Sequence, residues 1–163
     1  TGVQTCALPI SHQERACSSA SVDATSVYRP SSIISHARSG NRRGLVTTLL
    51  SNQQLNRPTQ IYGRLSTLRD YVDGRDVGRF IARNVSFRKS AGTENYLLAS
   101  GKPTSVRDII FLVEKATFRP LNLRVSPGGI GNDRDITFAR KSIAANFKCR
   151  DLETSIANIA RQV

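Results

Sequence analysis

The chain has 163 residues, of which 39% are hydrophobic and 22% are charged, a composition typical of one soluble globular domain. No apolar run approaches the ~18 residues that a membrane span requires, and no signal-peptide pattern occurs, so the sequence predicts a cytoplasmic protein with no membrane partner. Cys17 and Cys149 lie far apart and lack the spacing of metal ligands, which predicts reduced thiols and no metal site.

The formal net charge of +12 at pH 7 suggests nucleic acid as a partner, because basic domains attract phosphate. The excess comes mostly from arginines, which are spread from Arg15 to Arg161 with one Arg-Arg doublet, at Arg42 and Arg43. Neither a basic run nor interleaved aromatic residues accompany them. We therefore do not favour nucleic acid as a partner, and a basic nucleic-acid-binding module stays the less favoured alternative.

Residues 1–10 are interpreted as a translated sequencing adapter. One choice of codons for TGVQTCALPI gives ACTGGAGTTCAGACGTGTGCTCTTCCGATC, which resembles a widely used library adapter, and the chain contains no Met. We therefore expect residues 1–10 to be an artefact outside the fold. Residues 11–163 are expected to be the C-terminal portion of a longer protein.

In the first half of the chain, short extended patterns alternate with helical ones. A helix end is expected over residues 12–20, and strands over 25–28, 59–62 and 68–72, with Pro30 stopping the first strand. Residues 33–34 continue extended. Apolar residues at helical spacing predict helices over 44–52 and from Asp76 to about Val85.

The second half contains the best-formed pair of elements. A strand over 94–99 leads through a turn to Ser105, which is expected to cap a helix because Asp108 follows three residues later. A strand over 121–125, a loop over 127–131 and two short helices, over 139–146 and 152–159, complete the chain. Strands alternating with helices predict an α/β fold.

Four segments in this order resemble the C-terminal half of extended short-chain dehydrogenases/reductases, the NAD-dependent nucleotide-sugar epimerases and dehydratases. They are YRPSSI at 28–33; IYG at 61–63 with RDYV at 69–72 and Asp76-Val77; YLLASGKPTSV at 96–106; and Asn132-Asp133 with AANF at 144–147 and Leu152-Glu153. Together they cover nearly all of residues 25–159. The bacterial surface-polysaccharide members of the family are the most similar.

The resemblance implies the C-terminal part of a Rossmann-type doubly wound sheet plus a small substrate-binding subdomain, with the N-terminal dinucleotide-binding half missing. The sequence has neither Gly-x-x-Gly-x-x-Gly nor Tyr-x-x-x-Lys, so no catalytic residue is assigned. The parent would use NAD on a nucleotide-diphosphate sugar and is a candidate homodimer. The chain alone is expected to be inactive and poorly stable. A non-catalytic nucleotide-binding relative of the same fold is the main alternative.

The resemblance also assigns binding residues. Arg29 and Pro30 would contact the cofactor, and Ser32, where most relatives have Asn, would hydrogen-bond the sugar. Arg69 would bind the diphosphate, a role that suits a planar guanidinium; the alternative is a surface arginine paired with Asp70 or Asp73.

Four further residues complete the expected substrate site. Gln60 and Tyr62 would flank the nucleotide base, unless Tyr62 only packs in its strand, and Leu45 and Val46 would present backbone amides, unless they belong to the core. A second phosphate-binding arginine is left open between Arg124 and Arg134. Outside the site, Asp76 is expected to be a structural acid at a helix start, and His12 and His36 to be solvated.

Overall fold

A computed structural model describes residues 15, 16, 19, 24–36, 44–87, 92–128 and 134–162. Its elements are β1 (Ala24–Pro30), β2 (Ser32–Ile34), α2 (Leu45–Gln54), β3 (Thr59–Tyr62), β4 (Leu68–Arg69), β5 (Tyr71–Asp73), α3 (Gly74–Phe87), β6 (Gly92–Leu98), β7 (Thr104–Ser105), α4 (Val106–Thr117), β8 (Leu123–Ser126), the 3-10 turn η1 (Arg140–Ser142) and α5 (Leu152–Ala160). This alternation confirms the α/β class. Residues 1–10, His12 and most of the helix expected over 12–20 lie outside the described residues.

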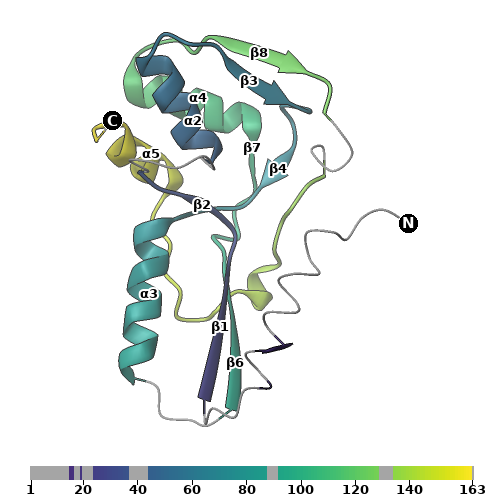
Figure 1. The fold of residues 1–163 in the computed structure, drawn as a ribbon, viewed down its shortest axis with the longest axis vertical. Coiled ribbons are helices and arrows are strands. Elements are labelled where there is room, and N and C mark those ends of the chain that lie inside the picture. Colours follow the sequence, from purple (N-terminus) through teal and green to yellow (C-terminus); the bar gives the residue numbers. More distant parts are fainter. Residues whose placement is uncertain are drawn as a thin grey trace.

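The strands pair two by two. β1 runs parallel to β6, β2 to β5, and β3 to β8, whereas β4 and β7 are antiparallel. Parallel pairs need long crossovers, and α3 lies in the crossover between β1 and β6. Figure 1 shows the long β1–β6 ladder with α3 beside it at one end of an elongated molecule, and α2, α4, β3 and β8 at the other end. Among the described residues, no strand pairs with the second edge of β1.

One sequence expectation is wrong and another is refined. The extended segment expected over 68–72 is present but divided into β4 and β5, because Asp70 between them turns its carboxylate into a buried network. The helix expected over 139–146 is wrong, because only the three-residue η1 forms there. Beyond η1 the chain makes a turn, closed by the Phe147 amide donating to the Ala144 carbonyl at 2.9 Å, because the Ala144 amide donates to the Leu97 carbonyl 2.9 Å away and this fixes the segment against β6. Pro30, expected to stop the first strand, is the last residue of β1.

Most of the apolar core lies among α2, α4 and α5. Its fully buried members are Val46, Leu49 and Leu50 of α2, Ile109 and Val113 of α4, and Ile156 and Ile159 of α5. The helix pattern of the sequence is thus confirmed for α4, and so is its cap. Ser105 Oγ accepts a hydrogen bond from the Asp108 amide at 3.1 Å, while Asp108 Oδ2 accepts from the Ser105 amide at 3.2 Å.

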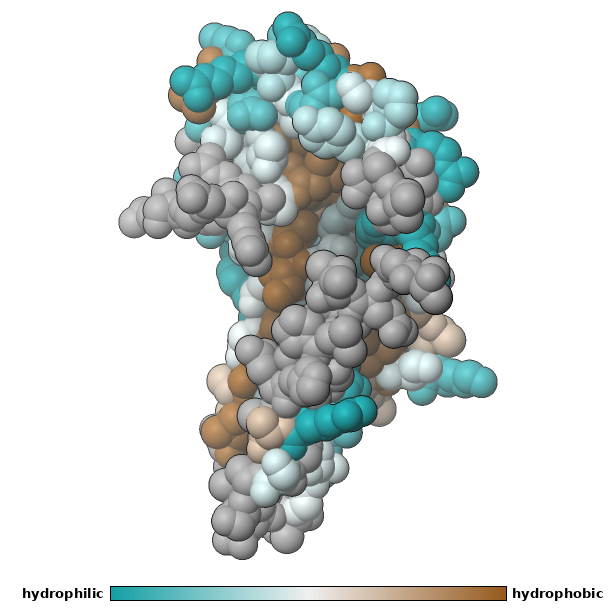
Figure 2. Space-filling model, turned by 45° about the vertical axis from the view of Figure 1, so that its right-hand side comes forward, coloured by the Kyte–Doolittle hydropathy of each residue, from teal (hydrophilic) through white to brown (hydrophobic). Residues whose placement is uncertain are grey.

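A second, aromatic cluster joins the β1–β6 ladder to α3. The rings of Tyr28 and Tyr96, cross-strand partners, stack with centroids 5.3 Å apart, and Phe80 of α3 meets both edge-on. The ring centroids of Phe147 and Phe80 lie 5.6 Å apart, so the segment after η1 also packs into this cluster. Figure 2 shows, on another face, a hydrophobic band running along much of the molecule. No helix in the described ranges is long and apolar enough to cross a membrane.

Candidate functional site

A buried carboxylate joins the ends of three strands. Asp70 is 1% exposed, and its Oδ1 accepts hydrogen bonds from Ser31 Oγ and the Ser100 amide, both at 2.8 Å. Its Oδ2 accepts from the Gly101 amide at 2.8 Å and from Ser100 Oγ at 3.0 Å. Four donors compensate for the loss of hydration of a buried charge. Asp70 thereby fixes the carboxyl ends of β1 and β6 against the start of β5.

The same junction brings Ser32 close to Arg69 through the pairing of β2 with β5. The Ser32 amide donates to the Asp70 carbonyl at 3.0 Å, and Ser32 is the cross-strand partner of Tyr71, two residues after Arg69. Helix α2 begins beside this strand, because a side-chain carbon added at Gly44, its N-cap, would lie 3.5 Å from the Ile33 carbonyl oxygen. Ser32, Arg69 and the start of α2 thus belong to one region.

The start of α2 offers backbone donors rather than side chains. Val46 is buried in the core and Leu45 packs against it, so only their backbone amides remain for a ligand. The first turn carries no acidic residue, and Gly44 provides no capping side chain. The unpaired amides of a helix N-terminus favour an anionic or oxygen-rich ligand.

Arg69 contacts the backbone rather than a carboxylate. Its guanidinium donates to the Arg134 carbonyl, and Arg69 also forms an isolated parallel bridge with Ile136. The alternative in which Arg69 pairs with Asp70 or Asp73 is wrong, because the hydrogen bonds of Asp70 come from Ser31, Ser100 and Gly101, and Asp73 binds Arg75. Arg69 therefore positions the returning chain segment at this edge.

Gln60 and Tyr62 lie on a different strand pair. Both are exposed on β3, where Gln60 Nε2 donates to Ser126 Oγ of β8 at 2.8 Å and Tyr62 is 63% exposed at the strand end. Simple strand packing does not account for so open a ring. Gly63 follows with φ of 99°, a conformation that suits glycine, and turns the chain toward β4.

The two candidate cofactor residues end β1. Arg29 and Pro30 are both exposed and face Leu97 and Leu98 across the ladder. They directly precede Ser31, which is bound to Asp70. The structure thus places the cofactor candidates at the end of β1, Ser32 at the start of β2 after one intervening residue, and Gln60 and Tyr62 on the separate β3–β8 pair.

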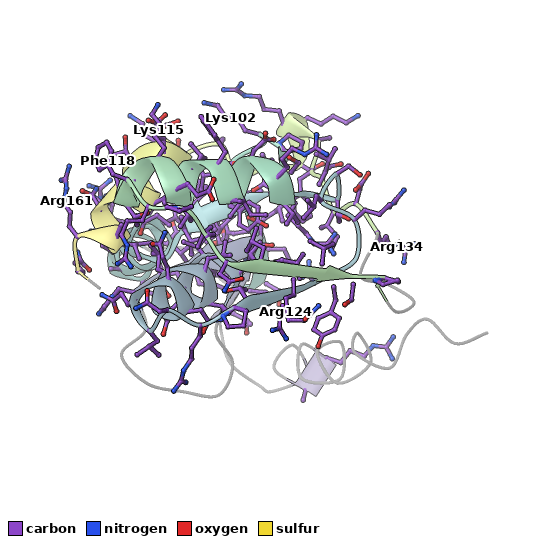
Figure 3. All side chains as sticks on the ribbon, turned by 90° about the horizontal axis from the view of Figure 1, so that it is seen from above. Lys102, Lys115, Phe118, Arg124, Arg134 and Arg161 are labelled. Atoms are coloured by element: carbon purple, nitrogen blue, oxygen red, sulfur yellow. The ribbon has the colours of Figure 1, made fainter. Side chains whose placement is uncertain are left out.

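The two candidates for a second phosphate-binding arginine also differ in position. In Figure 3, Arg124 lies on β8 and Arg134 lies beyond that strand, while Lys102, Lys115 and Phe118 lie on the opposite side. Arg134 is the residue whose carbonyl accepts from Arg69, so it is adjacent to Arg69 in space. Arg124 faces Gln60 across the β3–β8 pair.

Tyr71, next to this site, is not suited to acid–base work at neutral pH. Burial raises the pKa of its phenol, and the nearby Arg69 charge offsets only part of that rise. The phenol therefore stays protonated near pH 7 and serves as a hydrogen-bond donor or a packing group. Cys149, a free thiol, likewise has a pKa raised by burial.

Two further carboxylates, Asp73 and Asp76, form a buried ion-pair network at the start of α3. Asp73 Oδ2 lies 3.0 Å from the Arg75 guanidinium, and Asp76 pairs with Arg79 and with Arg150 Nη2 at 3.0 Å. Burial raises the pKa of Asp73, but the side-chain and backbone hydrogen bonds from Arg75 outweigh it and leave the pKa below its usual value. The structural role expected for Asp76 is confirmed.

Sequence reasoning missed two features of this region. The sequence indicates Asp70 only as a candidate partner for Arg69, although Asp70 is the acceptor that organises the junction. His36 was expected to be solvated, but it is half-buried and its Nδ1 is buried without a partner in the described part of the chain. The spacing of the motifs carries no signal for either feature. Within the described ranges, no group of three or more His, Cys, Asp or Glu residues is arranged to hold a metal.

No family model and no curated protein sequence matches the chain, but solved structures do. UDP-glucose 4-epimerase from Bifidobacterium longum, solved with NAD+ and UDP, is 17% identical with a TM-score of 0.75, over 94% of this chain and 51% of that one. UDP-glucose 4-epimerase from Stenotrophomonas maltophila, with NAD and formylated UDP-arabinopyranose, is 18% identical with a TM-score of 0.73, over 95% and 52%. MoeE5, with UDP-glucose and NAD, is 19% identical with a TM-score of 0.73, over 85% and 46%.

The likeness at these identities concerns the fold, and the chain spans about half the length of each matched protein. It confirms the expected fold class, in which parallel strand pairs and crossover helices form an α/β architecture of the Rossmann type. The chain has the α/β fold of Rossmann-type nucleotide-sugar epimerases over about half of their length.

Proposed function

We propose that this chain is the substrate-binding portion of an NAD-dependent nucleotide-sugar epimerase or dehydratase that acts in cell-surface polysaccharide synthesis in the cytoplasm. Residues 11–163 would form this portion, and a dinucleotide-binding half would complete the sheet along β1. Two observations support that division: β1 has one unpaired edge in the described part of the chain, and Figure 2 shows a long hydrophobic band.

One observation carries the proposal: Ser32, Arg69 and the start of α2 converge on the carboxyl ends of parallel strands. Ligands of doubly wound sheets bind at that edge. A hydroxyl, a guanidinium and unpaired helix amides are the groups that a sugar diphosphate needs, because they donate hydrogen bonds to hydroxyl and phosphate oxygens.

Each residue of the site then has a defined binding role. Arg69 binds the diphosphate, and Arg134, which shares a backbone contact with it, is the better-placed candidate for the second phosphate cation. Ser32 hydrogen-bonds the sugar, together with the amides of Leu45 and Val46. Tyr62 offers an exposed ring on which the nucleotide base stacks. Gln60 lies two residues earlier, on the same face of β3.

The residues at the end of β1 fit a cofactor. Arg29 and Pro30 are exposed, and Asp70 holds the next residue, Ser31, in place, so this strand end is rigid and open. NAD, when bound, accepts a hydride from the sugar. The residues of this chain orient the sugar and leave room for the nicotinamide, and the chain alone is expected to turn over no substrate.

The test is binding of UDP-glucose, UDP and uridine to the whole chain, measured by ligand-observed NMR. We expect weak binding of UDP-glucose and UDP and weaker binding of uridine, because the diphosphate supplies most of the interaction. Arg69→Gln should weaken UDP-glucose binding about tenfold or more, the value of one to two charge-assisted hydrogen bonds.

Arg107→Gln is the matched control, because Arg107 is exposed on α4 and its side chain makes no hydrogen bond or ion pair among the described residues. It should leave binding unchanged. Equal binding of uridine and UDP, or equal losses in the two variants, would contradict the proposal. Turnover of UDP-glucose by the chain with added NAD would overturn the expectation that it is inactive alone.

A further inference from the structure

A basic cavity lies apart from the residues of the strand-end site. It has a volume of about 600 Å³ and lies between α3 and the segment that precedes α5. Its lining residues are Asp76, Arg79, Phe80, Arg83, Asn84, Asn146, Lys148, Cys149 and Arg150. None of the residues proposed to bind the nucleotide sugar or NAD is among them.

The charges of this cavity are unbalanced. Four cationic side chains line it against one carboxylate. Asp76 is occupied by Arg79 and by Arg150, whose Nη2 and backbone amide lie 3.0 and 2.9 Å from its two oxygens. These contacts hold two guanidinium groups on the wall and leave the cavity positive. Arg83 and Lys148 have no ion-pair or hydrogen-bond partner in the described part of the chain.

The uncharged polar lining also includes an amide donor. Asn146 is exposed in the lining and can donate a hydrogen bond to a ligand oxygen. The Asn84 Nδ2, by contrast, is buried beside the Tyr96 hydroxyl, with which it interacts.

We propose that this cavity binds a phosphorylated metabolite through two or more phosphate oxygens. Its volume lies within the usual range for small-molecule sites, about 300–1,000 Å³. Arg79 and Arg150, fixed by Asp76, provide preorganised forks for the phosphate, and Arg83, Lys148 and Asn146 complete the donor set. The site is independent of the nucleotide-sugar site and gives the protein a second anion ligand.

The test uses inorganic pyrophosphate as the probe, with calorimetric titration of the whole chain in about 0.15 M NaCl to screen weak surface charges. We expect saturable binding that the double variant Arg83→Gln/Lys148→Gln weakens about tenfold or more. The charge-matched control is Arg107→Gln/Lys141→Gln, at two exposed cations outside the cavity. Saturable binding with no loss in the control supports the proposal; no binding, or equal losses in both variants, overturns it.

The Arg69→Gln variant separates this site from the proposed nucleotide-sugar site, which would also bind a diphosphate. In the Arg69→Gln background the cavity should still bind pyrophosphate, and adding Arg83→Gln/Lys148→Gln should weaken that binding about tenfold or more. Failure of UDP-glucose binding would then contradict the proposed function alone. If duplex DNA binds more tightly than pyrophosphate and the cavity variant abolishes both, the site serves a polyanion and the metabolite proposal is wrong.

Cys149 gives a second measurement at the same cavity. Its thiol is half-buried in the cavity wall and is free, so alkylation by iodoacetamide can be followed at its peptide by mass spectrometry. Saturating pyrophosphate should slow this alkylation in the unmodified chain and not in Arg83→Gln/Lys148→Gln. An unchanged alkylation rate in both proteins would overturn the proposal.

Discussion

Removing the Asp70 carboxylate should strongly destabilise the protein. The side chain accepts four hydrogen bonds, two from hydroxyls and two from the backbone amides of Ser100 and Gly101. The hydroxyls can rotate toward other acceptors, but the two amides cannot. Asp70→Ala leaves both amides unpaired in a buried position.

The expected magnitude follows from that count. Each buried donor without a partner costs about 1–3 kcal/mol, so Asp70→Ala should lower the free energy of unfolding by about 2–6 kcal/mol. This is a large part of the 5–15 kcal/mol typical of a whole domain. Asp70→Asn keeps one acceptor oxygen and places an NH2 group against the Gly101 amide, so it should cost about half as much.

Urea denaturation followed by circular dichroism measures these differences. The control is Asp135→Ala, which removes one hydrogen bond, from the Leu68 amide at 2.8 Å, at an exposed carboxylate. It should cost at most about 1 kcal/mol. Loss of stability in the order Asp70→Ala, Asp70→Asn, Asp135→Ala supports the account. If Asp70→Ala costs no more than Asp135→Ala, the buried network does not hold the strand ends together.

Three further changes test other parts of the fold. Ser105→Ala removes the cap of α4 and should cost about 1 kcal/mol in urea denaturation. Gly101→Ala should cost about 1–2 kcal/mol in the same assay, because residue 101 has φ of 70° and an added Cβ would lie 3.0 Å from Ile143 Cδ1. The pKa of Asp73 is lower folded than unfolded, so its stabilisation is complete above its unfolded pKa of about 3.9 and is lost as pH falls through the folded value. Unfolding free energies from pH 6 to pH 2.5 should therefore fall more steeply for the unmodified chain than for Asp73→Asn, and parallel curves would contradict this assignment.

Local signals predicted most of the elements. The capping box at Ser105 and the helical spacing of Ile109 and Val113 are contained in a few adjacent residues, and α4 follows them. The expectation failed over 139–146 because a non-local bond, from the Ala144 amide to Leu97 of β6, and the packing of Phe147 override the local pattern. Sequence spacing carries no information about such a partner.

The candidate site was likewise predictable in its local parts and not in its non-local contacts. The resemblance assigned the sugar contact to Ser32 and the diphosphate contact to Arg69, and the structure brings their segments together through Asp70. The guanidinium of Arg69 binds a carbonyl 65 residues later in the chain, which no motif indicates. Likewise, the arginines are spread along the sequence, yet Arg79 and Arg150 meet at one carboxylate and line one cavity with two further cations.

The most direct test of the central claim is a map of the backbone amides that respond to UDP-glucose, from a 15N-labelled chain titrated in solution by NMR. The account predicts that the amide shifts cluster at Ser32, at Leu45 and Val46, at Tyr62 and around Arg69. It also predicts that Arg69→Gln needs about tenfold or more UDP-glucose to reach the same shifts. Shifts confined to α3 and residues 146–150, or no shifts at a UDP-glucose concentration that saturates weak sites, would contradict the assignment of the strand-end region as the nucleotide-sugar site.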